Sequence, residues 1–324
     1  MAYSKFVAAL CAVALSAGAA FAQDYPTRQI TMVVPFAAGG PTDTVARLVA
    51  DKMSTDLGKQ IVIENVGGAG GTLGAGQVAK ADPDGYTLLL THIGMATSAT
   101  LYRKLAYDPA TAFSYVGLVT EVPMVFVSRK DFEPADFPAF VEYTKVNADK
   151  ITMANAGIGS ASHLCGMLYQ SAIGTQLVTV PYKGTGPAMT DLLGGQVDIM
   201  CDQTTNTTQQ IKGGTIKAYA VTTPNRVPVF PDLPTAEEAG LKGFEVSIWH
   251  GLYAPAGTPE AVTDRLSKSL QGALADESVI KAMQDLGTEP SPAADATPAA
   301  LKAKLDAEIA RWKPVIEAAG VYAD

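Results

Sequence analysis

Residue types that carry catalysis and metal binding are scarce in this chain. Its 324 residues include only three histidines, and none of them has the H-E-x-x-H spacing of a zinc protease. The sequence contains neither a G-x-S-x-G nucleophile elbow nor a G-x-x-x-x-G-K-[ST] phosphate loop. We therefore expect no catalytic residue, no metal and no cofactor, and we predict that the protein is not an enzyme.

Basic residues are also few. The chain has 24 Lys and Arg against 32 Asp and Glu, a net charge of −8, and no stretch rich in Lys or Arg. A nucleic-acid-binding surface needs such a cluster, so we expect no nucleic-acid partner. Beyond residue 22, no apolar run reaches the roughly 18 residues of a membrane helix. The mature protein is therefore predicted to be soluble.

The first 22 residues have the three parts of a secretory signal peptide. Lys5 supplies the positive start, residues 6–15 form the apolar segment, and Ala20-Phe21-Ala22 is the cleavage motif. We predict that the protein is exported and that the signal peptide is cleaved after Ala22.

Cysteine is rare as well, since Cys11 leaves with the signal peptide and only Cys165 and Cys201 remain. Disulfides persist in exported proteins, so we expect these two residues to be bridged. The alternative is a pair of separate buried thiols, because cysteine packs as a small hydrophobic residue.

What the sequence does have is an alternation of predicted strands and helices. One series starts with the apolar strand 30–34 and the helix 42–56, and a second starts with the strand 151–154 and the helix 161–173. Repeated βαβ units predict an α/β fold with mostly parallel sheets that are covered by helices on both faces.

After a separate segment at 113–119, two further predicted strands, 124–128 and 244–253, look like crossovers between the two series. We expect them to form the hinge of a two-lobed clamp. Lobe 1 would comprise residues 23–123 and 245–324, and lobe 2 would comprise residues 124–244.

The most informative segment is the turn between the first strand and its helix. Gly39 and Gly40 lead from the strand into a helix that begins near Thr42. The N-terminus of a helix presents unpaired N–H groups and the positive end of the helix dipole, which together suit an anion. No Lys or Arg stands at this turn, so main-chain donors would hold a small carboxylate or phosphate.

The second series repeats this arrangement at residues 155–163, where Gly157 and Gly159 precede the helix that starts at Ala161. Open α/β sheets bind ligands at the carboxyl ends of their strands, where both turns fall. We therefore predict that the two turns face each other across one cleft. The alternative is that each turn is an ordinary connector.

Two acidic residues stand near the predicted cleft. Asp43 suits helix capping, and Asp202 ends a predicted strand at 197–201. Asp202 could cap the following helix. It could instead accept a hydrogen bond from the ammonium group of an acidic amino acid. Thr91 and His92 end another predicted strand and would also reach the cleft.

The order of several motifs resembles the Bug receptors, the periplasmic solute-binding proteins of tripartite tricarboxylate transporters. The matching segments are Pro35–Arg47, Gly67–Gly71, Asp82–Leu88, Val180–Ala188, Asp191–Asp198 and Phe230–Gly240. The resemblance implies a periplasmic binding protein fold that traps a small carboxylate and presents it to membrane permease subunits.

The resemblance also implies which loops bind the ligand, namely 36–42 in the first lobe and 157–163 in the second. We expect a monomeric receptor for a dicarboxylate, tricarboxylate or aromatic acid. A receptor for aspartate or glutamate is the alternative, and a secreted enzyme acting on a small organic acid is a remote one. The predicted ligand-binding residues are Phe36, Ala37, Ala38, Gly39, Gly40, Thr42, Asp43, Thr91, His92, Gly157, Gly159, Ser160, Ala161, Ser162, His163, Tyr182 and Asp202.

Overall fold

A computed structural model describes residues 25–323 of the chain. The predicted signal peptide and its cleavage site therefore lie outside the described residues. Lobe 1 is the part built on β1 (Ile30–Val34), α2 (Pro41–Leu57), β2 (Ile61–Asn65), η1 (Ala69–Gly71), α3 (Thr72–Val78), β3 (Thr87–His92), α4 (Gly94–Leu101), α9 (Glu260–Leu274), α10 (Glu277–Asp285), β10 (Glu289–Pro290) and α11 (Pro298–Ala319). Lobe 2 is the part built on α5 (Phe137–Val146), β5 (Thr152–Asn155), α6 (Ala161–Ile173), β6 (Val178–Pro181), α7 (Thr185–Leu193), β7 (Ile199–Gln203), α8 (Thr204–Lys212) and β8 (Ile216–Val221).

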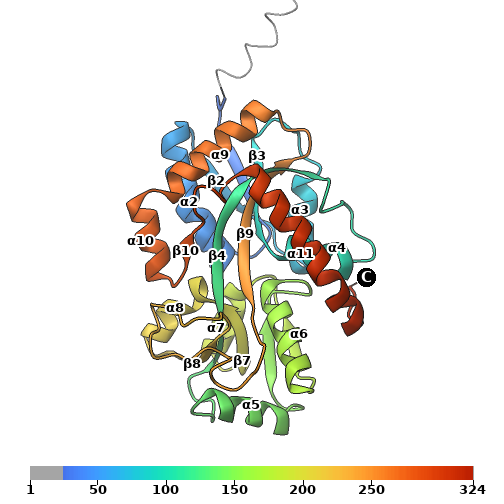
Figure 1. Cartoon of the computed structure of the whole chain (residues 1–324), viewed down its shortest axis with the longest axis vertical. Helices are drawn as coiled ribbons and strands as arrows, with labels where there is room; N and C mark the ends of the chain where they lie inside the picture. Colours follow the sequence, from blue (N-terminus) through green and yellow to red (C-terminus); the bar gives the residue numbers. More distant parts are fainter. Residues whose placement is uncertain (1–24, 324) are drawn as a thin grey trace, which may run out of the picture.

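Two long strands, β4 (Phe113–Arg129) and β9 (Ser247–Pro255), join the lobes. Figure 1 shows them side by side along the long axis of the molecule, with lobe 1 above and lobe 2 below. The strand order is β2-β1-β3-β9-β4-β7-β5-β6. The two lobes that the sequence predicted are present, and they share one continuous sheet, which was not predicted.

Parallel pairing is confined to the two ends of this order. β1 pairs in parallel with β2 and β3, and β5 does so with β6 and β7. The crossover strands pair antiparallel with their neighbours. The parallel strands predicted within each βαβ series are present, and antiparallel pairing enters through the two strands that run between the lobes.

β4 is one strand, whereas the sequence analysis treated 113–119 and 124–128 as separate segments. Its first part pairs with β9 as far as Pro123, and from Met124 onward it pairs with β7 and β8. The apolar pattern of β4 is interrupted by the polar residue Glu121 and, two residues later, by Pro123, at the point where the strand changes lobe. That interruption explains why one strand looked like two.

The β1–α2 unit illustrates how the local sequence sets the fold around the site. β1 is almost wholly buried and apolar, and α2 buries Val45, Val49 and Met53 along one face. Pro41 occupies the first helical position, where a missing N–H costs nothing. Gly39 has a φ of 77°, a conformation that favours glycine. The chain can therefore turn sharply from the buried strand into the helix.

The expected bridge between Cys165 and Cys201 is present, with 6.0 Å between the two Cα atoms. It joins α6 to the middle of β7, so it fixes two elements of lobe 2 to each other. None of the helices within residues 25–323 is long and apolar enough to cross a membrane.

Candidate functional site

A small enclosed cavity lies between the two lobes, and the centre of a water molecule can occupy only about 10 Å³ of it, which is room for about one water. Lobe 1 contributes the β1–α2 turn, the start of α2 and the end of β3, and lobe 2 contributes the ends of β5 and β7 with the starts of α6 and α7. The lining residues are Phe36, Pro41, Thr42, His92, Ala156, Ala161, Ser162, Thr185, Asp202 and Gln203.

Four helix N-termini meet at this cavity. Pro41 begins α2, Ala161 begins α6, Thr185 begins α7, and Gln203 is the residue just before α8. The N-caps of α2, α7 and α8 make no side-chain capping hydrogen bond. The first turns of these helices thus bring main-chain donors and the positive ends of four dipoles to one place.

No Lys or Arg is among the residues that line the cavity. The two histidines nearby are neutral at pH 7, because burial lowers the pKa of His92 to about 4 and that of His250 well below its usual value. The Gly94 N–H donates to His92 Nδ1 at 3.0 Å, which leaves the proton on Nε2. His92 also stacks on the Phe36 ring at 4.6 Å. The positive potential in the cavity therefore comes from dipoles.

Two polar side-chain atoms in the lining have no hydrogen-bond partner among the described residues. They are Thr185 Oγ1 and Gln203 Oε1, on residues that are 4% and 2% exposed. Buried polar atoms are rarely left unpaired, because desolvating them is costly. Both residues line the cavity, so these two atoms are available to a polar ligand.

Asp202 is the one carboxylate in the lining. Its Oδ2 accepts a hydrogen bond of 2.6 Å from Asn206 Nδ2. Burial raises the pKa of Asp202 to about 6, although hydrogen bonds from Asn206 and from the Gln203 main chain oppose the shift. The Thr185 hydroxyl also opposes the rise in the pKa of Asp202, but its oxygen makes no hydrogen bond of normal geometry. Asp202 is thus a carboxylate that can change its protonation state near neutral pH.

Six of the predicted site residues line this cavity, namely Phe36, Thr42, His92, Ala161, Ser162 and Asp202. Thr42 Oγ1 also lies at a hydrogen-bonding distance of 3.3 Å from Nε2 of the buried His250, which helps to fix the Thr42 side chain. The remaining predicted residues lie outside the lining: Ala37, Ala38, Gly39, Gly40, Asp43, Thr91, Gly157, Gly159, Ser160, His163 and Tyr182.

Asp43 interacts with its own lobe. Its carboxylate accepts hydrogen bonds from the Gly39 N–H at 3.0 Å, from Arg47 Nε at 2.9 Å and from Asn65 Nδ2 at 3.0 Å. Burial alone would raise the pKa of Asp43, but these hydrogen bonds together lower it. Asp43 therefore braces the β1–α2 turn, and it already occupies the N–H of Gly39 that the sequence analysis assigned to a ligand.

Several other predicted residues shape the loops around the cavity. The Ser160 side chain caps α6 by accepting the N–H of His163, and His163 Nδ1 accepts the N–H of Gly159 at 3.3 Å. The Tyr182 hydroxyl donates to Asp191 at 2.6 Å. Tyr182 lines an open groove at the rim of the interlobe space together with Ala38 and Gly39.

Four lining residues were not among the predicted ligand-binding residues, namely Pro41, Ala156, Thr185 and Gln203, although Pro41 lies in the predicted loop 36–42. Thr185 follows Gly184 at the start of α7, the same signal that identified the first two turns. Gln203 directly follows Asp202 at the end of a strand. The rule that strand ends and helix starts face the cleft would have found both residues.

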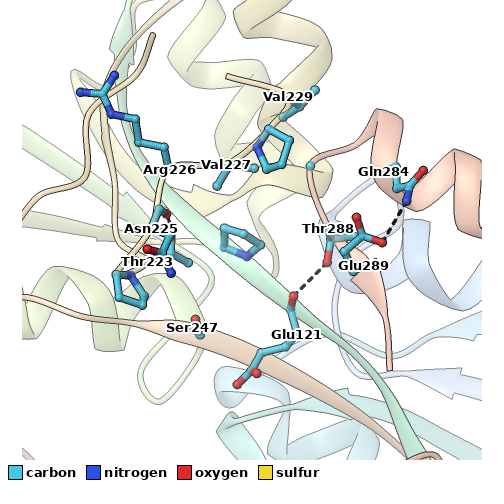
Figure 2. A pocket seen from close by; sticks show the side chains of 14 residues that line it. Glu121, Thr223, Asn225, Arg226, Val227, Val229, Ser247, Gln284, Thr288 and Glu289 are labelled. Atoms are coloured by element: carbon cyan, nitrogen blue, oxygen red, sulfur yellow. Dashed lines mark hydrogen bonds between the residues drawn. The ribbon is translucent and has the colours of Figure 1, made fainter. Parts of the chain in front are cut away.

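A larger groove lies elsewhere, at the flank of the crossover strands. Figure 2 shows it between the segment with Val227 and Val229 and the segment from Gln284 to Glu289, with Glu121 and Ser247 at its base. It is open to solvent, and none of its lining residues carries an unpartnered buried side-chain atom in the described structure. Residues 25–323 also contain no cluster of His, Cys, Asp or Glu suited to a metal. The enclosed cavity is therefore the stronger candidate.

Known proteins resemble this chain along nearly its whole length. Residues 45–321 match the model of the tripartite tricarboxylate transporter family receptor. A protein from Agrobacterium vitis, described as lying in the TAR-I ttuE-ttuC' intergenic region, is 56% identical over 98% of this chain and 92% of its own.

Solved structures agree with this match. The structure of the periplasmic binding protein BugD is 56% identical, with a TM-score of 0.91 over 93% of this chain and all of its own. The structure of MatC from Rhodopseudomonas palustris with bound malate is 44% identical, with a TM-score of 0.87 over 90% of this chain and all of its own.

Proposed function

Since this chain belongs to the tripartite tricarboxylate transporter receptor family, whose members bind solutes and are not enzymes, we propose that it captures a small dicarboxylate between its lobes. The observation that carries the proposal is the meeting of four helix N-termini at one enclosed cavity. Export to the periplasm accords with the relative BugD, which is described as a periplasmic binding protein.

Charge supports a doubly negative ligand. Each helix N-terminus carries roughly half an elementary charge, so four of them supply about two positive charges. The lining contains no cation to add to this sum. A dicarboxylate would neutralise the four helix ends if Asp202 were protonated. MatC, the relative with bound malate, accords with a ligand of this charge.

The proposed roles follow from the lobe that each residue belongs to. The first turn of α2 at Thr42 would hold one carboxylate from lobe 1. The first turns of α6 and α7, at Ala161 and Thr185, would hold the other from lobe 2. Phe36 and the neutral His92 would pack against the carbon chain between them, because their rings already stack at the wall of the cavity.

An acidic amino acid is the second candidate, and Asp202 is the observation that favours it. An ammonium group beside Asp202 would pair with the ionised carboxylate and lower its pKa from about 6. Charge again sums to zero, with two positive charges from the helix ends, one negative charge from Asp202 and one from a zwitterionic diacid. Thr185 Oγ1 and Gln203 Oε1 could accept the remaining ammonium protons.

Calorimetric titration of the mature protein with succinate, malate and aspartate would test both candidates. Glucose and lysine serve as controls, because neither brings two carboxylates. Binding by at least one diacid and by neither control is the expected result. If no diacid binds, or if glucose binds as well as malate does, a dicarboxylate receptor is ruled out.

The variant Asp202→Asn separates the two candidates. It should weaken aspartate by about 1 to 3 kcal/mol, the range for a hydrogen bond to a charged group, and should leave succinate unchanged or tighter. Malate and succinate affinity in the wild type should also rise as pH falls from 8 to 6, whereas aspartate affinity should fall. The ligand titrates in the same way with both proteins, so the difference in affinity between the wild type and Asp202→Asn at each pH isolates the titration of Asp202. An aspartate affinity that Asp202→Asn does not change would contradict the ammonium role.

Capture would require closure about a hinge in β4 and β9, with lobe boundaries near residues 123 and 244. The closed, monomeric receptor would then deliver its ligand to membrane permease subunits, as the family's name implies. Cells that lack the receptor should take up the identified acid slowly, and the plasmid-borne wild-type chain should restore uptake. Uptake at the normal rate without the receptor would argue against delivery.

A further inference from the structure

Main-chain atoms of the two lobes meet beside the cavity. The Ala37 N–H of lobe 1 donates to the Lys183 carbonyl of lobe 2 at 3.0 Å. Nearby, the Tyr102 hydroxyl of lobe 1 donates to the Ile158 carbonyl of lobe 2 at 2.8 Å. Backbone atoms of separate lobes can approach this closely only where side chains do not intervene.

Glycines occupy both sides of this contact. A Cβ built on Gly67 of lobe 1 would lie 2.7 Å from the Lys183 carbonyl oxygen, and one on Gly186 of lobe 2 would lie 2.8 Å from the Ala38 carbonyl oxygen. We define the glycine seam as Gly40, Gly67 and Gly70 of lobe 1 with Gly157, Gly184 and Gly186 of lobe 2. None of the six lines the cavity.

Gly40 and Gly157 were predicted to bind the ligand, and no role was predicted for Gly184 or Gly186. Glycines are also dense at residues 67–76, where Gly74 packs its helix against lobe 1, because a Cβ there would lie 2.9 Å from the Pro35 Cα. Gly70 instead faces the other lobe, where a Cβ would lie 1.8 Å from the Ile158 carbonyl oxygen. A requirement inside one lobe therefore does not explain Gly67 or Gly186, whereas Gly70 also has a φ of 59°, which by itself favours glycine.

We propose that the glycine seam is the closure contact of the receptor and sets its ligand affinity without touching the ligand. This inference rests on the proposed function, because it supposes that the lobes open and close around a bound acid. The apparent affinity for a ligand scales with the fraction of molecules that can reach the binding-competent state. A methyl group in the seam would lower that fraction by holding the lobes apart.

Gly186→Ala is the sharpest test, since Gly186 lies in α7 and its φ is not in the left-handed region. Alanine should therefore not destabilise lobe 2 itself, because it is the better helix former. Gly67→Ala places a methyl group in the same seam from the lobe 1 side. Gly272→Ala is the matched control, since Gly272 lies in α9 with no atom within 4 Å of a built Cβ.

Malate titration should show both seam variants binding about 5- to 100-fold more weakly than the wild type, the range for one overpacked methyl. Gly272→Ala should bind as the wild type does. Unfolding temperatures without ligand should stay close to that of the wild type. Gly67 and Gly186 lie in different lobes, so if one variant fails to fold, the other still tests the proposal.

Hydrogen exchange at the Ala37 amide provides a readout that needs no ligand. This amide should exchange faster in both seam variants than in the wild type or in Gly272→Ala, because its acceptor lies across the seam. Wild-type affinity together with unchanged exchange at Ala37 in folded seam variants would overturn the proposal. If the wild type binds no acid, the proposed function fails, and the exchange experiment still decides the seam.

Discussion

Removing the charge of Asp202 should stabilise the ligand-free protein at neutral and alkaline pH. Asp202 is 1% exposed, and its pKa is raised from 3.8 to about 6 because burial penalises the ionised form. The folded protein therefore holds this proton more tightly than the unfolded chain does. The contribution to stability is fully present below about pH 4 and is lost as pH rises through about 6.

The size of the effect follows from the shift. About two pKa units at 1.36 kcal/mol each correspond to about 3 kcal/mol of stability lost between pH 4 and pH 7. Asp202→Asn keeps an oxygen that can accept the Asn206 N–H and cannot ionise. We expect it to match the wild type near pH 4 and to exceed it by about 2 to 3 kcal/mol at pH 8. For a chain of about 300 residues this difference is roughly 5 °C in Tm.

Urea unfolding of both proteins at several pH values between 4 and 8 measures the difference directly. Asp43→Asn provides a control of opposite sign, because hydrogen bonds lower the pKa of Asp43 in the folded state. Its stability deficit should be present and nearly constant from pH 4 to pH 8, because that contribution is lost only as pH falls below the unfolded pKa of 3.8, whereas the Asp202→Asn advantage grows across the same range. The reasoning is refuted if the difference between Asp202→Asn and the wild type does not change with pH, or if the wild type is the more stable at pH 8.

Two further predictions concern lobe 2. Replacing Cys165 and Cys201 together by alanine should cost about 4 kcal/mol in urea unfolding, because the bridge spans 36 residues and removes about 13 cal/mol/K from the unfolded chain. A loss below about 1 kcal/mol would contradict that estimate. Burial lowers the pKa of His163 to about 4, so the stability it contributes above pH 6.5 is lost as pH falls to 4. His163→Gln should therefore reduce the acid sensitivity of the unfolding midpoint, and an unchanged pH profile would contradict this.

Most of the fold could be predicted because its elements follow the period of their own sequence. The helix predicted at 42–56 spans Pro41–Leu57, and the one predicted at 161–173 has those bounds. The helix Gly94–Leu101 was not predicted. It consists mainly of small and apolar residues buried on most sides, so no polar face marks its turns.

The candidate site could be predicted only in part, because the signal available was local. A strand that ends in glycines before a helix identifies an anion-binding turn, and both predicted turns reach the cavity through Thr42 and Ala161. Helix capping was the favoured prediction for Asp43, which accepts the Gly39 N–H and pairs with Arg47 at the i,i+4 spacing, but the hydrogen bond from Asn65 forms only in the folded lobe. The contact between Ala37 and Lys183 joins lobes that no local pattern relates.

The scarcity of cations and the glycine seam have a common physical consequence. A Lys or Arg at the β1–α2 turn could attract a carboxylate over several ångströms from one open lobe. The field of a helix N-terminus falls off within its first turn, so one such end holds an anion weakly. Three of the four helix ends at the cavity belong to lobe 2 and one belongs to lobe 1. The lobe 1 contribution adds to the three of lobe 2 only when the lobes approach to backbone distance, and glycines such as Gly67 and Gly186 permit that approach. Under the proposed function, strong binding and closure are therefore one event.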